Sequence, residues 1–122
     1  MACAAAATTT IYSESAQAQG IGAWSRDDQI LGGLVLTAYT MDHVTTLYGI
    51  RHRVENTHET NLLLSRHPTV AEVGLHYLAG LVFIYKVSEE FPAVRSHLLG
   101  GILAVELSVT AHNVNLGWRL SW

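Results

Sequence analysis

The first long apolar stretch of the chain, residues 30–50, has the sequence ILGGLVLTAYTMDHVTTLYGI and contains one carboxylate, Asp42. Two further apolar stretches follow, at residues 70–87 and 97–117. A bilayer core of about 30 Å is crossed by roughly 20 helical residues, and all three stretches fit the tolerated range. The sequence therefore predicts an all-α fold with three transmembrane helices, at about residues 30–50, 70–87 and 97–117.

The segments between these stretches are polar. Residues 51–69 include arginines, histidines, two glutamates and Pro68, and residues 88–96 include Glu89, Glu90 and Pro92. Proline disrupts a helix interior, so Pro68 and Pro92 are expected at helix boundaries. We expect residues 1–29 to form a polar N-terminal tail and residues 30–122 to form the membrane domain.

The composition of the whole chain favours the same class. The protein has 122 residues, which suits one domain, and only 14% of them are charged, against about a quarter in ordinary soluble domains. The net charge is −3 and the basic residues are scattered, which argues against a nucleic-acid partner. Cys3 is the single cysteine, so no intramolecular disulfide forms.

The alternative to a membrane protein is a soluble bundle of long helices, because each apolar stretch carries an ionisable group. A charge at the bilayer centre costs about 2.5–3.5 kcal/mol on insertion scales. The aromatic residues favour the membrane. Trp24 precedes the first stretch and Trp118 follows the third, as expected for rings at the headgroup level. Tyr39 and Tyr77 lie in mid-stretch and do not fit that pattern.

The polar residues within the stretches gather on particular helical faces. Helical spacing groups them as follows: Asp42, Thr45 and Thr46 in the first stretch, His76 in the second, and Glu106, Thr110 and Asn113 in the third. Charged groups at membrane depth face protein or water rather than lipid. We therefore expect Asp42, His76 and Glu106 to converge on an interior or a polar cavity. There they either fix the helix register as hydrogen-bond partners or provide a proton or ion path.

The third stretch also has a line of small residues on its opposite side, namely Gly100, Ala104, Ser108 and Ala111. Small residues at this spacing let two helix backbones approach closely. This second packing face predicts self-association, or docking on another membrane subunit.

The polar segment after the first stretch contains residues that are weak candidates for metal ligands. Glu55 and His58 have a Glu-x-x-His spacing, Glu59 adds a carboxylate, and Asn61 follows. A di-iron bundle needs two such motifs on two helices, and here there is one. A wet interfacial segment is the alternative interpretation, so we expect no metal or other cofactor. The chain has no Gly-x-Ser-x-Gly and no phosphate-binding glycine loop, so no enzyme activity is expected.

The chain contains two short motifs, Asp42-x-x-Thr45-Thr46 and Glu59-x-Asn61. Because of these motifs, residues 30–117 resemble a family of small three-helix integral membrane proteins of unknown function. Leu62 stands where that family usually has proline. The resemblance implies a fold and a membrane location but no reaction. It also makes the five residues of these elements the first positions to test.

Three functions remain as hypotheses. The leading one is a structural or accessory multi-pass membrane protein that assembles with itself or with a larger membrane complex. The second is a small oligomeric permeation protein, for example a holin-like or virion-associated phage protein, or a proton or ion path through Asp42 and Glu106. The third is a membrane metal-binding protein that uses Glu55, His58 and Glu59.

Overall fold

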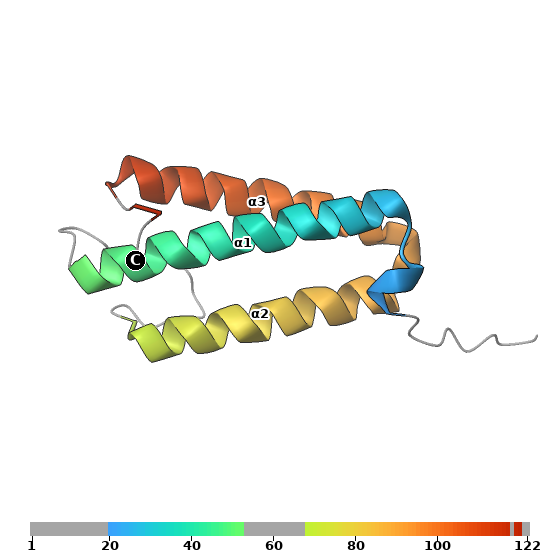
Figure 1. Ribbon diagram of the computed structural model, residues 1–122, viewed down its shortest axis with the longest axis horizontal. Helices are drawn as coiled ribbons and strands as arrows, with labels where there is room; N and C mark the ends of the chain where they lie inside the picture. Colours follow the sequence, from blue (N-terminus) through green and yellow to red (C-terminus); the bar gives the residue numbers. More distant parts are fainter. Residues whose placement is uncertain (1–19, 53–67, 118, 121–122) are drawn as a thin grey trace, which may run out of the picture.

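A computed structural model describes residues 20–52, 68–117 and 119–120, and within these residues the chain is helical and has no strand. The three long helices are α1 (Arg26–His52), α2 (Val70–Glu90) and α3 (Arg95–Asn115). Two short 3₁₀ helices, η1 (Ile21–Ala23) and η2 (Pro92–Val94), precede α1 and α3. The long helices lie side by side, with α1 between α2 and α3 (Figure 1). The predicted all-helical fold is thus confirmed.

Local capping signals explain where the helices begin. Thr69 and Glu72 form a capping box at the start of α2, in which the Glu72 amide donates to the Thr69 hydroxyl at 3.2 Å. This agrees with the predicted start beside Pro68. At α1, the hydroxyl of Ser25 accepts a hydrogen bond from the Asp28 amide at 3.1 Å. That contact caps an otherwise unpaired donor, and α1 begins before the predicted start at Ile30.

Two of the three helices are long and apolar enough to cross a membrane: α2, and the segment Pro92–Asn115 that combines η2 and α3. Only 6% of the most apolar part of the first and 11% of that of the second are buried within the molecule. α1 is not among the helices that pass this test, because its apolar part is interrupted by Asp42 and His43 and by several threonines. Transmembrane character is therefore supported for α2 and α3, and for α1 it stays a prediction.

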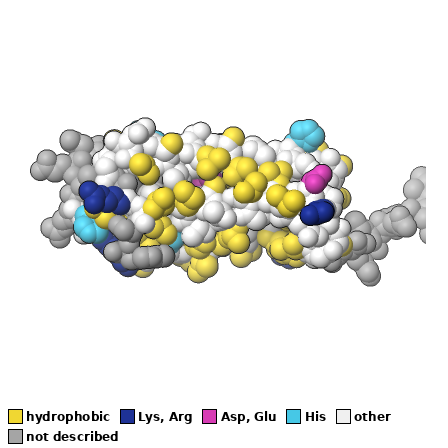
Figure 2. Space-filling view, turned by 45° about the horizontal axis from the view of Figure 1, so that its top comes forward, with side chains coloured by type: hydrophobic (Ala, Val, Ile, Leu, Met, Phe, Trp, Pro, Cys, Tyr) yellow, Lys and Arg dark blue, Asp and Glu magenta, His cyan; other side chains and the backbone are white. Residues whose placement is uncertain are grey.

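α1 is the most enclosed of the three helices. It packs chiefly on α3 and less on α2, whereas α2 and α3 contact each other little. Its buried residues include Val35, Ala38, Val44, Thr45 and Gly49. The least apolar helix thus has its polar groups shielded by two more apolar neighbours. Apolar side chains cover the middle of the visible face, and arginine and lysine side chains gather toward its ends (Figure 2).

Candidate functional site

A polar cluster joins α1 to α3 in the half of the bundle near the end of α1. The side-chain amide of Asn113 donates to Asp42 Oδ1 at 2.9 Å and to Thr45 Oγ1 at 3.1 Å. The Thr45 hydroxyl donates in turn to the backbone carbonyl of Asp42 at 2.9 Å. Thr45 is fully buried and Asn113 is 5% exposed. The structure thus joins Asp42 and Thr45 of α1 to Asn113 of α3, and Asp42 is the one of the three residues expected to converge that belongs to this cluster.

Glu106 lies in the same region but does not take part in this hydrogen-bonded cluster. Its carboxyl group is half-buried and close enough to Asp42 for their charges to interact. It forms no hydrogen bond or ion pair with any residue in the described part of the chain.

Thr110, one turn further along α3, is buried, and its hydroxyl has no partner among the described residues. Thr46 is also buried on α1.

An aromatic contact joins α1 to α2. The rings of Tyr39 and Tyr77 stack with centroids 5.3 Å apart, and His43 stacks on Tyr77 at 4.3 Å. The hydroxyls of Thr40 and Tyr77 are hydrogen-bonded at 2.9 Å. These are the mid-stretch tyrosines that did not fit an interfacial belt. They serve instead as interhelical contacts, beside the predicted His76, which is half-buried on α2.

The small-residue line on α3 makes little contact with the other helices of the described chain. Ala104, Ser108 and Ala111 are exposed, and Gly100 is half-buried. The Ser108 hydroxyl donates to the Ala104 carbonyl of its own helix at 2.7 Å, so it does not bond another helix through that proton. The predicted second packing face is therefore open to a neighbour.

The predicted loop residues Glu55, His58, Glu59 and Asn61 lie outside the described residues. Among the residues that are described, no group of three His, Cys, Asp or Glu side chains is arranged to hold a metal ion.

A second cluster, which sequence reasoning missed, holds the start of α1 to the turn between α2 and α3. Trp24 is 8% exposed, and its indole N–H donates to the Glu89 carboxylate. The backbone amide of Gly20 donates to the same carboxylate at 3.0 Å. The Arg95 guanidinium lies 4.6 Å from the centre of the Trp24 ring, which also stacks on Tyr85. The Trp24 ring, predicted at a membrane interface, therefore packs within the protein.

Asp28 links the two sides of this cluster. The Ser96 hydroxyl donates to Asp28 Oδ1, and Arg95 lies 3.7 Å from Oδ2. Arg95 also donates through Nε to the Ser88 carbonyl at 2.8 Å. The Ser96 hydrogen bond, with help from Ser25 and Arg95, lowers the pKa of the Asp28 carboxyl, against an opposing effect of burial. This end of the bundle is a structural clamp in which Trp24, Glu89, Asp28 and Arg95 are paired, while the buried Ser88 hydroxyl has no partner among the described residues.

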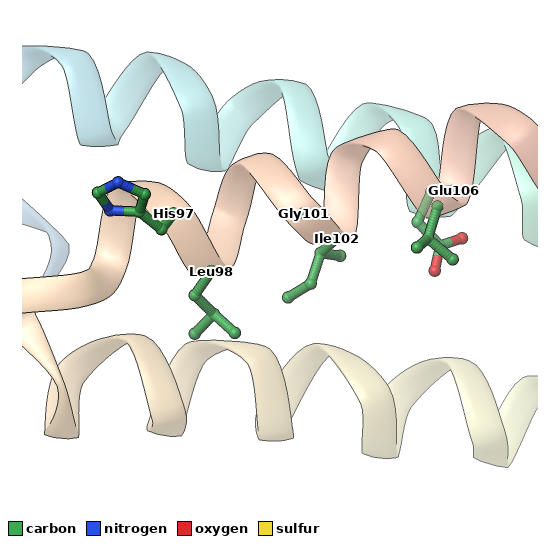
Figure 3. A pocket seen from close by; sticks show the side chains of 6 residues that line it. His97, Leu98, Gly101, Ile102 and Glu106 are labelled. Carbon is green, nitrogen blue, oxygen red and sulfur yellow. The ribbon is translucent and has the colours of Figure 1, made fainter.

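An open apolar groove of about 420 Å³ runs along α3. It is lined by His97, Leu98, Gly101, Ile102, Val105 and Glu106. Leu98 and Ile102 project toward α2, and Glu106 lies at one end of the groove (Figure 3). All six lining residues belong to α3, which contacts α2 little.

No protein-family model matches the chain, and no curated protein or solved structure matches it closely enough to indicate a relationship. The resemblance carried by the Asp42 and Glu59 elements therefore stays a prediction.

Proposed function

We propose that the chain is a multi-pass integral membrane protein with a structural or accessory role, which assembles through the outer face of α3. The observation that carries the proposal is the outward apolar face of α2. Leu75 is 70% exposed and Phe83 is 67% exposed, with Leu78 and Val82 between them on the same face. Soluble monomers rarely expose contiguous apolar patches larger than a few hundred Å², whereas lipid satisfies such a face without a partner protein.

The packing of α1 supports including it as a third spanning helix. Its low hydropathy comes partly from residues that the bundle encloses, such as Thr45 and Thr46, and from Asp42, which is bonded to Asn113. Intramembrane polar groups that face a bundle interior are tolerated. Between residues 30 and 37 the outward side of α1 is mostly apolar, with Ile30, Leu34 and Leu36 about half exposed and Thr37 also exposed.

Membrane insertion is tested by extraction. Membranes from expressing cells are washed with alkaline carbonate and then with urea. We expect the protein to stay in the pellet and to need detergent for release. Release by either wash without detergent would refute membrane insertion.

The assembly part of the proposal rests on the open line of Ala104, Ser108 and Ala111, because small residues four positions apart permit close helix contact. In a Cys3→Ser background, Ala104→Cys and Ala111→Cys are expected to form oxidised dimers in the membrane. The matched control is Leu78→Cys on the outer face of α2, which should stay monomeric. Equal crosslinking at all three positions would indicate random collision and would contradict assembly through α3.

Permeation is the second candidate, because the Asp42 and Glu106 carboxyl groups are close enough for their charges to interact and lie on helices proposed to span the membrane. Tyr39 stacks on Tyr77 between α1 and α2, and Asn113 is hydrogen-bonded to Asp42 between α1 and α3, so we propose that such a path would form between several copies. Proton flux into liposomes, compared with Asp42→Asn and Glu106→Gln, tests this candidate. Flux equal to that of empty liposomes would exclude it.

A further inference from the structure

We propose that the α3 groove binds lipophilic organic cations, with the Glu106 carboxylate as the counter-charge. The inference rests on the membrane placement proposed above. It starts from an electrostatic observation: Glu106 is half-buried and has no hydrogen-bond or ion-pair partner in the described part of the chain. An ionised carboxylate in apolar surroundings is costly unless a cation pairs with it or it takes up a proton. A cationic ligand would remove that cost.

The position of Glu106 restricts the class of ligand. It lies eleven residues beyond Arg95, which corresponds to about 16 Å along a helix axis. If Arg95 lies at the headgroup level, Glu106 is near the middle of a bilayer core of about 30 Å. A lipid headgroup amine does not reach this depth easily. A ligand must itself be apolar apart from its charge.

The lining of the groove points to the same class. Between His97 and Glu106 the wall consists of Leu98, Gly101, Ile102 and Val105. These residues offer no side-chain oxygen to replace the water around an inorganic ion, and such ions prefer several oxygen ligands. The volume of about 420 Å³ falls within the range of roughly 300–1,000 Å³ for small-molecule sites.

The charges around the groove favour a cation over an anion or a neutral compound. Asp42 is near enough to Glu106 for charge interaction and adds negative potential. The lysines and arginines of the described chain lie toward the ends of the helices or beyond them, namely Arg26, Arg51, Lys86, Arg95 and Arg119. His97 lies at the other end of the groove, about 13 Å from Glu106 along the helix. It is therefore too far from Glu106 to form an ion pair with it.

The test is binding of tetraphenylphosphonium to the full chain in liposomes, measured by equilibrium dialysis, with neutral triphenylphosphine oxide as the matched compound. We expect saturable binding of the cation that falls at least tenfold in Glu106→Gln and stays unchanged in Glu90→Gln, an exposed acid at the end of α2. Gly101→Leu, which places a side chain in the groove, should also lose binding. Flotation of each variant with the liposomes and its helical circular dichroism confirm insertion and folding.

Several results would overturn the inference. They are absence of saturable binding by floated wild-type protein, equal binding by Glu106→Gln, or equal binding of the neutral compound. In each case the floated protein leaves the membrane placement intact. Failure of the wild-type protein to float would instead overturn the membrane placement and this inference with it.

Discussion

The hydroxyl of Tyr39 on α1 lies directly against the backbone of Gly80 on α2, so close that a Cβ at position 80 would collide with it. This contact supports the stacking of Tyr39 on Tyr77. Gly80 is therefore a packing residue, because only the absence of a side chain allows the α1 tyrosine to approach.

Gly80→Ala is expected to weaken the α1–α2 contact. Overpacking of a closely fitted site typically costs about 1–3 kcal/mol, which exceeds the gain of up to about 1 kcal/mol from the higher helix propensity of alanine. The measurement is the free energy of unfolding in detergent, followed by circular dichroism. Gly74→Ala on the same helix is the control, since nothing lies within 4 Å of a Cβ there. A Gly80→Ala protein as stable as the Gly74→Ala protein would show that the contact is absent.

Asn113→Ala should destabilise the α1–α3 contact. The substitution removes two hydrogen bonds, to Asp42 and Thr45. Loss of a partner for buried polar groups costs about 1–3 kcal/mol. Unfolding in detergent measures the loss, and Asn115→Ala, at an exposed position at the end of α3, should change stability by less than about 0.5 kcal/mol. Equal effects of the two substitutions would argue against the cluster.

Thr110→Val, one turn before Asn113 on α3, should not destabilise the protein, in contrast to Asn113→Ala. The Thr110 hydroxyl is buried without a partner among the described residues. Replacing it by a methyl group of similar shape should leave stability unchanged or raise it by about 1–2 kcal/mol. A loss of more than about 1 kcal/mol in the same unfolding assay would show that this hydroxyl has a bonding partner, such as an ordered water.

The pH dependence of the clamp follows from Asp28. Its pKa is lowered from the ordinary value of 3.8 by the Ser96 hydroxyl, with help from Ser25 and Arg95. A carboxyl with a depressed folded-state pKa stabilises the fold above its unfolded-state pKa, and that contribution disappears as pH falls through the folded-state pKa. Stability should therefore fall below about pH 4.

Thermal unfolding measured between pH 7 and pH 2, in a detergent that does not titrate, tests this expectation. Asp28→Asn should flatten the acid limb of the curve, and Ser96→Ala should move that limb to higher pH. A wild-type curve that coincides with the Asp28→Asn curve would refute the role of this carboxylate.

Helical periodicity predicted much of the architecture, and the reasons for its failures are physical. The predicted helices occur because three apolar stretches are separated by Pro68 and Pro92, and the 3.6-residue period placed Asp42 and Asn113 on inward faces. Periodicity identifies a face but not the helix opposite. The clamp of Trp24, Glu89 and Arg95 joins residues about seventy positions apart, and no local pattern specifies such pairs. Trp24 was interpreted from its position beside an apolar stretch, a signal that does not distinguish a lipid interface from a protein contact.

The Gly80–Tyr39 contact was missed for a related reason. A glycine in an apolar stretch is an ordinary feature, and its significance appears only when the partner on the other helix is known. The open groove beside Glu106 lies along α3, which contacts α2 little. Both features belong to the tertiary arrangement rather than to any one helix.

The central claim is that lipid covers the outer face of α2 and the side of α3 that carries Val105, beside the small-residue line proposed for assembly. The most direct test is the accessibility of nitroxide labels to relaxation agents in liposomes, with Leu78→Cys and Val105→Cys made in a Cys3→Ser background and Glu90→Cys as the control at the bundle end. The account predicts strong relaxation by oxygen and little by a water-soluble nickel chelate at positions 78 and 105, with the reverse at position 90. Strong relaxation by the nickel chelate at positions 78 and 105 would place these faces in water and contradict the account.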